Sequence, residues 1–177
     1  MVIGELIGHI GTASRVSRHA GSLECFQFIK SHVETCMLNH KCSLDRRRLS
    51  LLPDRVIWVN APQAPSHIQL IEPQGKIRAP YLALSYCWGP VSSSTYLTNA
   101  STFAARKAGI ASADLPPLFQ DVVTIARLLR IEYVWIDRLC IIQGSSIDFS
   151  QQAPKMGAIY GNATLTIAAA SAVCYTP

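Results

Sequence analysis

Apolar residues recur along the chain at two spacings, one typical of helices and one typical of strands, and the two kinds of segment alternate. Helical periodicity and helix-ending residues predict helices at 22–38, 101–108, 115–130 and 150–160. Short apolar or β-branched runs predict strands at 55–59, 68–71, 81–88, 133–143 and 163–170. Such alternation is typical of an α/β fold, in which helices cover the faces of a sheet.

The order of these segments also suggests where each one lies. The strand at 81–88 is too apolar to have a solvated face, which predicts a central position, and the run at 163–170 is expected to be a further buried strand. The runs at 55–59 and 68–71 are joined by a proline-containing loop and predict an antiparallel pair at one edge. The helix at 22–38 is expected to lay one face on the core.

One acid interrupts the apolar run 133–143 and makes it the first place to look for function. An unpaired carboxylate costs several kcal/mol to bury, so Asp137 must leave the core at a strand end or find a donor there. The predicted helix 115–130 precedes this run and a turn-rich segment follows it. Helix, strand and exposed loop in that order place sites at the carboxyl ends of strands in open α/β sheets.

Composition and charge exclude several classes of function. The apolar fraction is 49%, charged residues make up 15%, and the net charge is +5. The only dense positive point is Arg46-Arg47-Arg48, where Asp45 and Asp54 lie close by in sequence, so a solvated loop is favoured over a nucleic-acid interface. No run approaches the roughly 18 apolar residues that a membrane span needs.

The six cysteines are expected to be reduced thiols of a cytoplasmic protein, because no secretory signal precedes them. Cys87 and Cys140 fall inside strands that are expected to be buried. Cys36, His40 and Cys42 offer three ligands within seven residues, but zinc usually takes four. A capped helix end is therefore favoured there and no metal is expected, with a structural metal as the alternative.

Four blocks of the sequence resemble the successive blocks of the fungal heterokaryon-incompatibility (HET) domain, in that family's order and spacing. They are YLALSYCWG at 81–89, Leu115-Pro116 with Phe119 and Asp121, YVWIDRLCIIQ at 133–143, and Met156 to Ala163 with TIAA at 166–169. The resemblance covers about residues 50–172. It implies a fungal protein of self/non-self recognition and programmed cell death. It also implies a TIR-like (flavodoxin-like) domain with a mostly parallel sheet flanked by helices, an N-terminal helix and a small antiparallel edge.

The same resemblance suggests a division of the chain. Residues 1–21 are expected to be a poorly ordered leader, 22–49 an N-terminal helix with the Cys/His preamble, and 50–177 the HET domain. Family members are usually longer, so this domain is expected to be incomplete at its C-terminus.

Two functions remain open at this point. Relatives of the TIR fold act either as self-associating adaptors, which bind protein partners, or as NAD hydrolases, for which NAD is a substrate and no cofactor is needed. As a hydrolase the chain would hold phosphates with the 85–94 segment, stack Trp88 or Trp135 on a ring, and use Asp137 or Asp148 as the charged group. The phosphate-holding candidates are Ser85, Gly89 and Ser92. For each tryptophan core packing is favoured, and for Asp137 a structural carboxylate is an equal alternative.

Gln152 is a departure that bears on catalysis. The family commonly has Asp-Trp followed by a glutamate at this point, whereas this chain has Asp148-Phe149 and then Gln152. If that glutamate serves the nicotinamide ribose, an amide cannot replace it, because it cannot ionise to stabilise an oxocarbenium ion. The sequence therefore favours the adaptor, with a disabled hydrolase as the alternative. A thiol enzyme based on Cys140 is disfavoured, since burial raises a thiol pKa.

Overall fold

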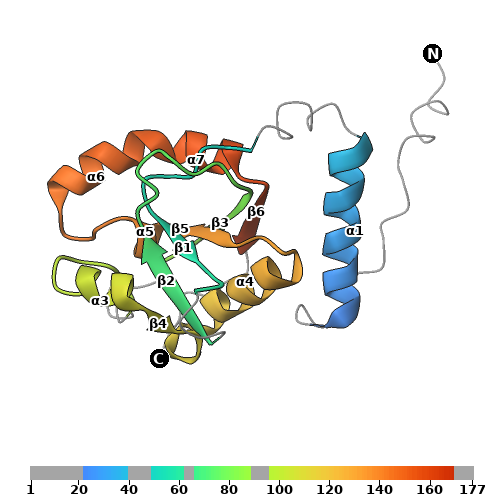
Figure 1. Ribbon diagram of the computed structural model, residues 1–177, viewed down its shortest axis with the longest axis horizontal. Helices are drawn as coiled ribbons and strands as arrows, with labels where there is room; N and C mark the ends of the chain where they lie inside the picture. The colour runs from blue at the N-terminus through green and yellow to red at the C-terminus, as the bar shows by residue number, and fades with distance from the viewer. Residues whose placement is uncertain (1–21, 40–48, 62–65, 89–95, 170–177) are drawn as a thin grey trace, which may run out of the picture.

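The computed structural model describes residues 22–39, 49–61, 66–88 and 96–169, and within them six strands form one open sheet in the order β4-β2-β1-β5-β3-β6 (Figure 1). The strands are β1 (Val56–Trp58), β2 (His67–Ile71), β3 (Tyr81–Tyr86), β4 (Ile110–Ala111), β5 (Tyr133–Ile136) and β6 (Leu165–Ala169). The α-helices are α1 (Leu23–Asn39), α3 (Phe103–Ala108), α4 (Pro117–Leu128), α5 (Asp137–Cys140), α6 (Ser146–Gln152) and α7 (Met156–Asn162). Two 3-10 turns are η4 (Ser112–Asp114) and η5 (Ala153–Lys155). The expected α/β class is confirmed.

The sheet is mixed, and the expectation of a mostly parallel sheet is therefore wrong. β3 runs parallel to both β5 and β6, whereas β1 is antiparallel to β2 and β5, and β2 is antiparallel to β4. Parallel neighbours need a long crossover connection, usually a helix. The chain supplies one between β3 and β5, which includes α4, and one between β5 and β6, which includes α5 to α7. The short connection from β1 to β2 can only return the chain antiparallel.

The predicted antiparallel pair is present, but β2 is not the outermost strand. Ile57 of β1 lies opposite Leu70 of β2, as two strands joined by a short loop require. β4 pairs with the outer side of β2 through Ile110 and becomes the edge. At two residues β4 is too short for a periodic pattern to reveal it.

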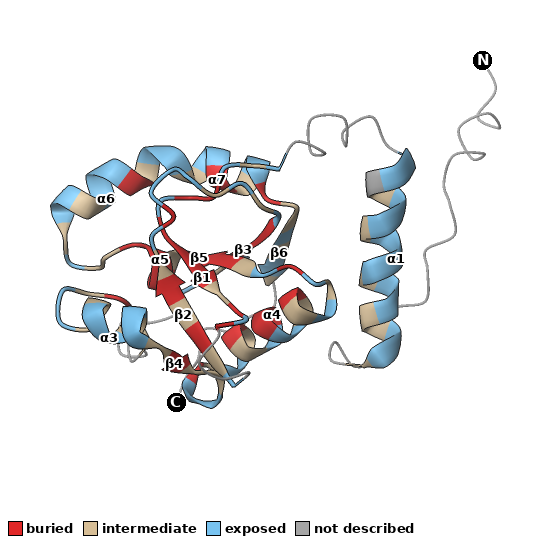
Figure 2. Ribbon diagram, viewed as in Figure 1, coloured by how far each residue is buried: buried red, intermediate tan, exposed pale blue. Residues whose placement is uncertain are grey.

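Helices cover both faces of the sheet. Alternate residues of β3 and β5 point to opposite sides, so each face presents side chains on which a helix packs. On one side Trp135 meets Tyr160 of α7 edge-to-face, with ring centroids 5.4 Å apart, and the Tyr81 hydroxyl donates to the Ile159 carbonyl at 2.6 Å. On the other side Tyr86 meets Phe119 of α4 edge-to-face at 5.5 Å. Figure 2 shows the buried residues concentrated on the central strands and on the side of α4 that faces them.

Prolines and glycines set the helix ends much as the sequence predicts. α4 begins at Pro117 directly after Pro116. α3 ends before Gly109, which has a φ of 142°, a backbone conformation that glycine adopts readily and other residues rarely adopt. The predicted helix 150–160 is divided at Pro154: α6 stops at Gln152, one 3-10 turn follows, and α7 starts at Met156. A proline in a helix interior removes a hydrogen bond and clashes with the preceding turn, which accounts for the break.

Two strand predictions need correction. The run 133–143 is not one strand, since β5 ends at Ile136 and α5 begins at Asp137. β6 is an edge strand whose residues alternate between intermediate and exposed, so it is not buried as expected. Its residues alternate between the two faces with a period of two, and within the described ranges only β3 pairs with it.

The N-terminal helix is present, but it does not pack into the core as expected. Ser22 caps it by accepting a hydrogen bond from the Cys25 backbone N–H at 3.1 Å. None of the described side chains of α1 is buried, and Figure 1 shows this helix standing beside the α4 end of the body. A shallow groove of about 200 Å³ lies between its first turns and the last turn of α4. The predicted leader 1–21, His40, Cys42 and Arg46 to Arg48 lie outside the described residues.

Candidate functional site

The candidate site lies at the carboxyl ends of the two central parallel strands. Leu84 of β3 is paired with Ile136 of β5, so the residues that follow them emerge side by side. Those residues include Trp88 after β3, and Asp137 and Arg138 at the start of α5. This is the edge at which open α/β sheets bind ligands.

Asp137 meets both conditions that its position imposes, because it sits where β5 leaves the core and it also finds donors there. The Trp88 indole Nε1 donates to Oδ2 at 2.6 Å, and the Arg138 backbone N–H donates to Oδ1 at 2.7 Å. Burial nevertheless raises the pKa of this carboxyl above its usual 3.8, and these hydrogen bonds only partly oppose that shift. Through these hydrogen bonds Asp137 holds the segment after β3 against the end of β5.

Arg138 is the least expected member of this cluster. Its side chain is only 7% exposed, although arginine is almost never buried unless it is paired. Its Nη2 donates to the Trp88 carbonyl at 3.1 Å, and its guanidinium carbon lies 4.9 Å from the centroid of the Trp88 ring, a cation–π contact. Its Nε is buried without a hydrogen-bond partner.

Two tyrosines share the electrostatic field of this site. Burial raises the pKa of Tyr86 far above the usual 10, and the negative charge of Asp137 raises it further. Tyr160 lies on the other side of the sheet, and burial together with the negative charge of Asp137 raises its pKa as well. The Tyr86 hydroxyl is buried and makes no hydrogen bond of standard geometry among the described residues, but hydrogen bonding to Asp137 also contributes to its raised pKa.

Thr98 and Gln143 hold α5 in place. Thr98 donates its backbone N–H to the Arg138 carbonyl at 2.9 Å and its hydroxyl to the Leu139 carbonyl at 2.8 Å, and it is fully buried. Gln143 donates its backbone N–H to the Thr98 carbonyl at 2.7 Å and its side-chain amide to the carbonyls of Asp137 and Ile141 at 3.3 and 3.1 Å. The two bonds from Thr98 satisfy the Arg138 and Leu139 carbonyls near the end of this four-residue helix, where a helix leaves its carbonyls without partners of its own.

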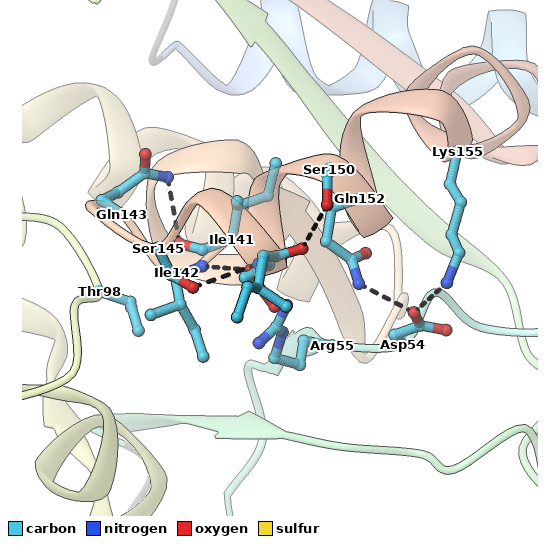
Figure 3. A network of polar contacts seen from close by, with 12 residues as sticks. Asp54, Arg55, Thr98, Ile141, Ile142, Gln143, Ser145, Ser150, Gln152 and Lys155 are labelled. Carbon is cyan, nitrogen blue, oxygen red and sulfur yellow. Dashed lines mark hydrogen bonds and ion pairs between the residues drawn. The ribbon is translucent and has the colours of Figure 1, made fainter.

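Asp148 and Gln152 belong to a second network, which ties α6 to the start of β1 (Figure 3). Arg55 Nη2 bonds the Asp148 carboxylate at 2.5 Å in a buried ion pair, and the Ile142 backbone N–H donates to its other oxygen at 2.8 Å. Gln152 is buried and donates its amide to Asp54 at 2.9 Å. Lys155 bonds the same oxygen of Asp54 at 2.5 Å.

The remaining predicted site residues do not gather around Asp137. Trp135 is 1% exposed and packs in the core, which is the role that was favoured for it. Ser85 is exposed in β3 opposite Ala168 of β6. Gly89 and Ser92 lie outside the described residues.

The two strand cysteines behave differently from each other. Cys140 is buried in α5, and burial raises the pKa of its thiol to about 12, so it carries little thiolate at neutral pH. Cys87 follows β3 and is exposed, against expectation, because β3 ends one residue earlier. In the described part of the chain no three His, Cys, Asp or Glu side chains come together as a metal site.

Sequence reasoning missed Arg55, Arg138 and Thr98. Arg55 and Arg138 are polar residues that adjoin apolar runs, the same signal that drew attention to Asp137, whereas Thr98 lies in a polar segment that gives no such signal. Their partners Asp148, Trp88 and Leu139 lie 93, 50 and 41 positions away, so only the fold pairs them.

Replacing Asp137 or Asp54 with Asn should change the pH dependence of stability in opposite directions. The folded state raises the pKa of Asp137, so wild type loses this contribution to stability as pH rises from 3.8 through the raised value. The folded state lowers the pKa of Asp54, chiefly through the hydrogen bond from Lys155, so its contribution is present above 3.8 and lost as pH falls through the lowered value. Relative to wild type, Asp137→Asn should therefore gain stability with rising pH and Asp54→Asn should lose it.

Urea unfolding of the three proteins at steps of about one pH unit between about pH 3 and 7 measures both slopes. Only the slopes matter, since each substitution also alters hydrogen bonds at every pH. Slopes of the same sign for the two variants would contradict the assignment.

Fold and site together define an α/β protein with an open mixed sheet, in which an acid, an arginine and an exposed tryptophan meet at the carboxyl ends of two parallel strands. The family model for the heterokaryon incompatibility protein (HET) matches residues 81–174, more than half of the chain, and this range includes the site. The chain belongs to the HET family, and its function is of the heterokaryon-incompatibility type. Comparisons with curated proteins and with solved structures gave no match. No helix in the described ranges is long and apolar enough to cross a membrane.

Proposed function

We propose that this chain acts in fungal self/non-self recognition as a cytoplasmic, non-catalytic signalling domain that promotes cell death by associating with itself and with protein partners. The observation that carries the proposal is that all three candidate catalytic side chains are engaged in hydrogen bonds within the protein. Asp137, Asp148 and Gln152 all hydrogen-bond other parts of the fold. These bonds give each of the three side chains a structural role, which supports a non-catalytic function.

The charge of the second network supports the same function. Asp148 is neutralised by Arg55 inside the protein, and Gln152 donates its amide to Asp54, which also binds Lys155. A glutamate in place of Gln152 would set two carboxylates beside one lysine. The network therefore favours an amide at this position, and its role is to fasten α6 to the sheet.

α6 offers exposed apolar side chains to partners. Ile147 and Phe149 are strongly exposed on the two flanks of this helix, two positions apart, while Asp148 between them anchors it. Exposed apolar side chains on a firmly held helix can be buried by a partner at little conformational cost. α6 is therefore the element that we expect to contact a partner.

Expression of the chain in a fungal host tests the proposal, with cell death and cellular NAD measured together. Wild type should cause death without loss of NAD. An Ile147→Asp/Phe149→Asp variant should stay folded, because both side chains face solvent, and should lose most of the killing. Gln151→Asp, at an exposed position of the same helix, is the matched control and should kill like wild type.

Killing by the double variant at the level of the control would contradict the role of α6. The second candidate is a TIR-type NAD hydrolase, which is favoured by the 38% exposed ring of Trp88 beside Asp137. Loss of NAD together with nicotinamide release by the purified wild-type protein would establish that candidate and overturn the adaptor. Killing without loss of NAD, even by a Gln152→Glu variant, would exclude it.

A further inference from the structure

We propose that Arg138 anchors a binding site for an oxyanion, the phosphate or carboxylate group of a small ligand, at the carboxyl ends of β3 and β5. This inference goes beyond the proposed adaptor function and does not depend on it.

Two arginines in this fold are equally buried, but only one has an anionic partner. Arg55 is 6% exposed and Arg138 is 7% exposed. Arg55 forms an ion pair with Asp148, whereas no ion pair joins Arg138 to a carboxylate of any described residue. A guanidinium cannot give up its charge in a protein, so an unpaired buried one is costly. An ion pair offsets this cost for Arg55, whereas Arg138 has only the Trp88 carbonyl, the Trp88 ring and the more distant charge of Asp137.

The nearest acid does not serve as the missing partner. Asp137 adjoins Arg138 in sequence, yet its oxygens bond the Trp88 indole and the Arg138 backbone N–H, and its carboxylate lies beyond ion-pair distance of the guanidinium. The guanidinium instead bonds one neutral carbonyl, that of Trp88. Its fork of donors is therefore only partly used.

A second buried donor lies near the same acid. The Tyr86 hydroxyl makes no hydrogen bond of standard geometry among the described residues, but it interacts with the Asp137 carboxylate, whose charge and hydrogen bonding raise the pKa of Tyr86. Tyr86 lies two residues before Trp88, and the Nε atoms of both Arg138 and Arg55 make no hydrogen bond in the described part of the chain. Guanidinium and phenol groups both donate to oxyanions, and arginine presents a fork that matches carboxylate and phosphate. A cationic ligand fits poorly, because Arg138 carries the same charge and both Asp137 oxygens already accept hydrogen bonds.

The position of the cluster agrees with a ligand site. Trp88 covers the guanidinium with its ring and is itself 38% exposed, so the charge lies one side chain below the surface. A modest movement of Trp88 would open the guanidinium to a ligand, and the ring would then lie against it. This placement at the carboxyl edge is that of ligand sites in open α/β sheets.

Thermal unfolding of residues 1–177 at pH 7 tests the site. The probes are sodium phosphate, ADP and succinate, each against sodium chloride at equal ionic strength. At about 100 times its Kd, a bound probe should raise the Tm of wild type by about 5–10 °C. Arg138→Met should abolish this rise, and Arg78→Met, which removes the same charge from an exposed position, should keep it.

A second readout needs no ligand. In sodium chloride the Tm of Arg138→Met should equal or exceed that of wild type, since the substitution removes an unpaired buried charge and keeps an unbranched side chain.

The probes also distinguish the two kinds of oxyanion. A rise in the Tm of wild type with phosphate and ADP but not with succinate would show that the site binds a phosphate group, and the reverse would show that it binds a carboxylate.

Three results would overturn the site: no response of wild type to any probe, the same response in Arg138→Met, or a fall in the Tm of Arg138→Met in chloride to that expected for a broken ion pair. If Arg138→Met does not fold, Arg138→Lys replaces it. That variant keeps the charge but loses the fork, and it should respond more weakly than wild type. An undiminished response in Arg138→Lys would equally overturn the site.

Discussion

Replacing Arg55 with Met should lower the free energy of unfolding by about 3–5 kcal/mol, because the change strands a carboxylate inside the protein. Arg55 and Asp148 are bonded at 2.5 Å, and their side chains are 7% and 12% exposed. Water cannot replace the lost partner there, and among the described residues the Asp148 carboxylate keeps the Ile142 backbone N–H as its donor. Denaturation with urea, followed by circular dichroism, measures the loss.

Two comparisons make this result specific to the buried pair. Lys107→Met breaks the pair with Glu72, bonded at 2.6 Å, but those side chains are 44% and 36% exposed, and the expected loss is below about 1 kcal/mol. The double variant Arg55→Met/Asp148→Asn removes both charges and should recover part of the stability. Equal losses for Arg55→Met and Lys107→Met would mean that solvent screens the Arg55–Asp148 pair as well.

Replacing Trp135 with Ala should cost about 3–5 kcal/mol, the range for removal of a large aromatic side chain from a core. The ring is 1% exposed and packs edge-to-face on Tyr160, so it fastens α7 to the central strand. A cavity left in this apolar part of the core would stay dry. This loss is a large share of the free energy of unfolding of a typical domain, so the Tm of the variant, measured by thermal unfolding, should fall well below that of wild type.

Trp88→Ala is the matched comparison, since both tryptophans were candidates for stacking on a ligand. Trp88 is 38% exposed, and its removal deletes one hydrogen bond to Asp137 and the contact with Arg138. Solvent can take over part of both interactions, so the expected loss is about 1–2 kcal/mol. A Trp135→Ala variant no less stable than Trp88→Ala would show that Trp135 is not a core residue.

Most of the fold's elements can be read from local patterns. The strands β1, β2 and β3 and the helices α1, α3 and α4 fall where the spacing of apolar residues and the prolines or glycines at their ends predict them. These signals are local, since they depend on residues within one or two turns. The same signals failed at 133–143, because an apolar run does not reveal whether it continues as a strand or turns into a short buried helix.

The site was predictable only in part. The apolar surroundings of Asp137 indicated that it needed partners or an exit from the core, and it has both. Nothing in the local pattern indicated that Arg138 would be buried or that Asp148 would be neutralised by Arg55. Those facts depend on which segments the fold brings together.

By itself, the sequence determined the order of the longer helices and strands, the antiparallel pairing of β1 with β2, the α/β class and the family, because periodicity, helix ends and ordered motif blocks all lie in short stretches of chain. Only the tertiary structure decided the directions of the other strand pairs, the edge position of β6 and the partners of the buried charges. Strand direction follows from which connections are long enough to cross over. A charge finds its partner, or remains without one, only after segments far apart in sequence have packed together.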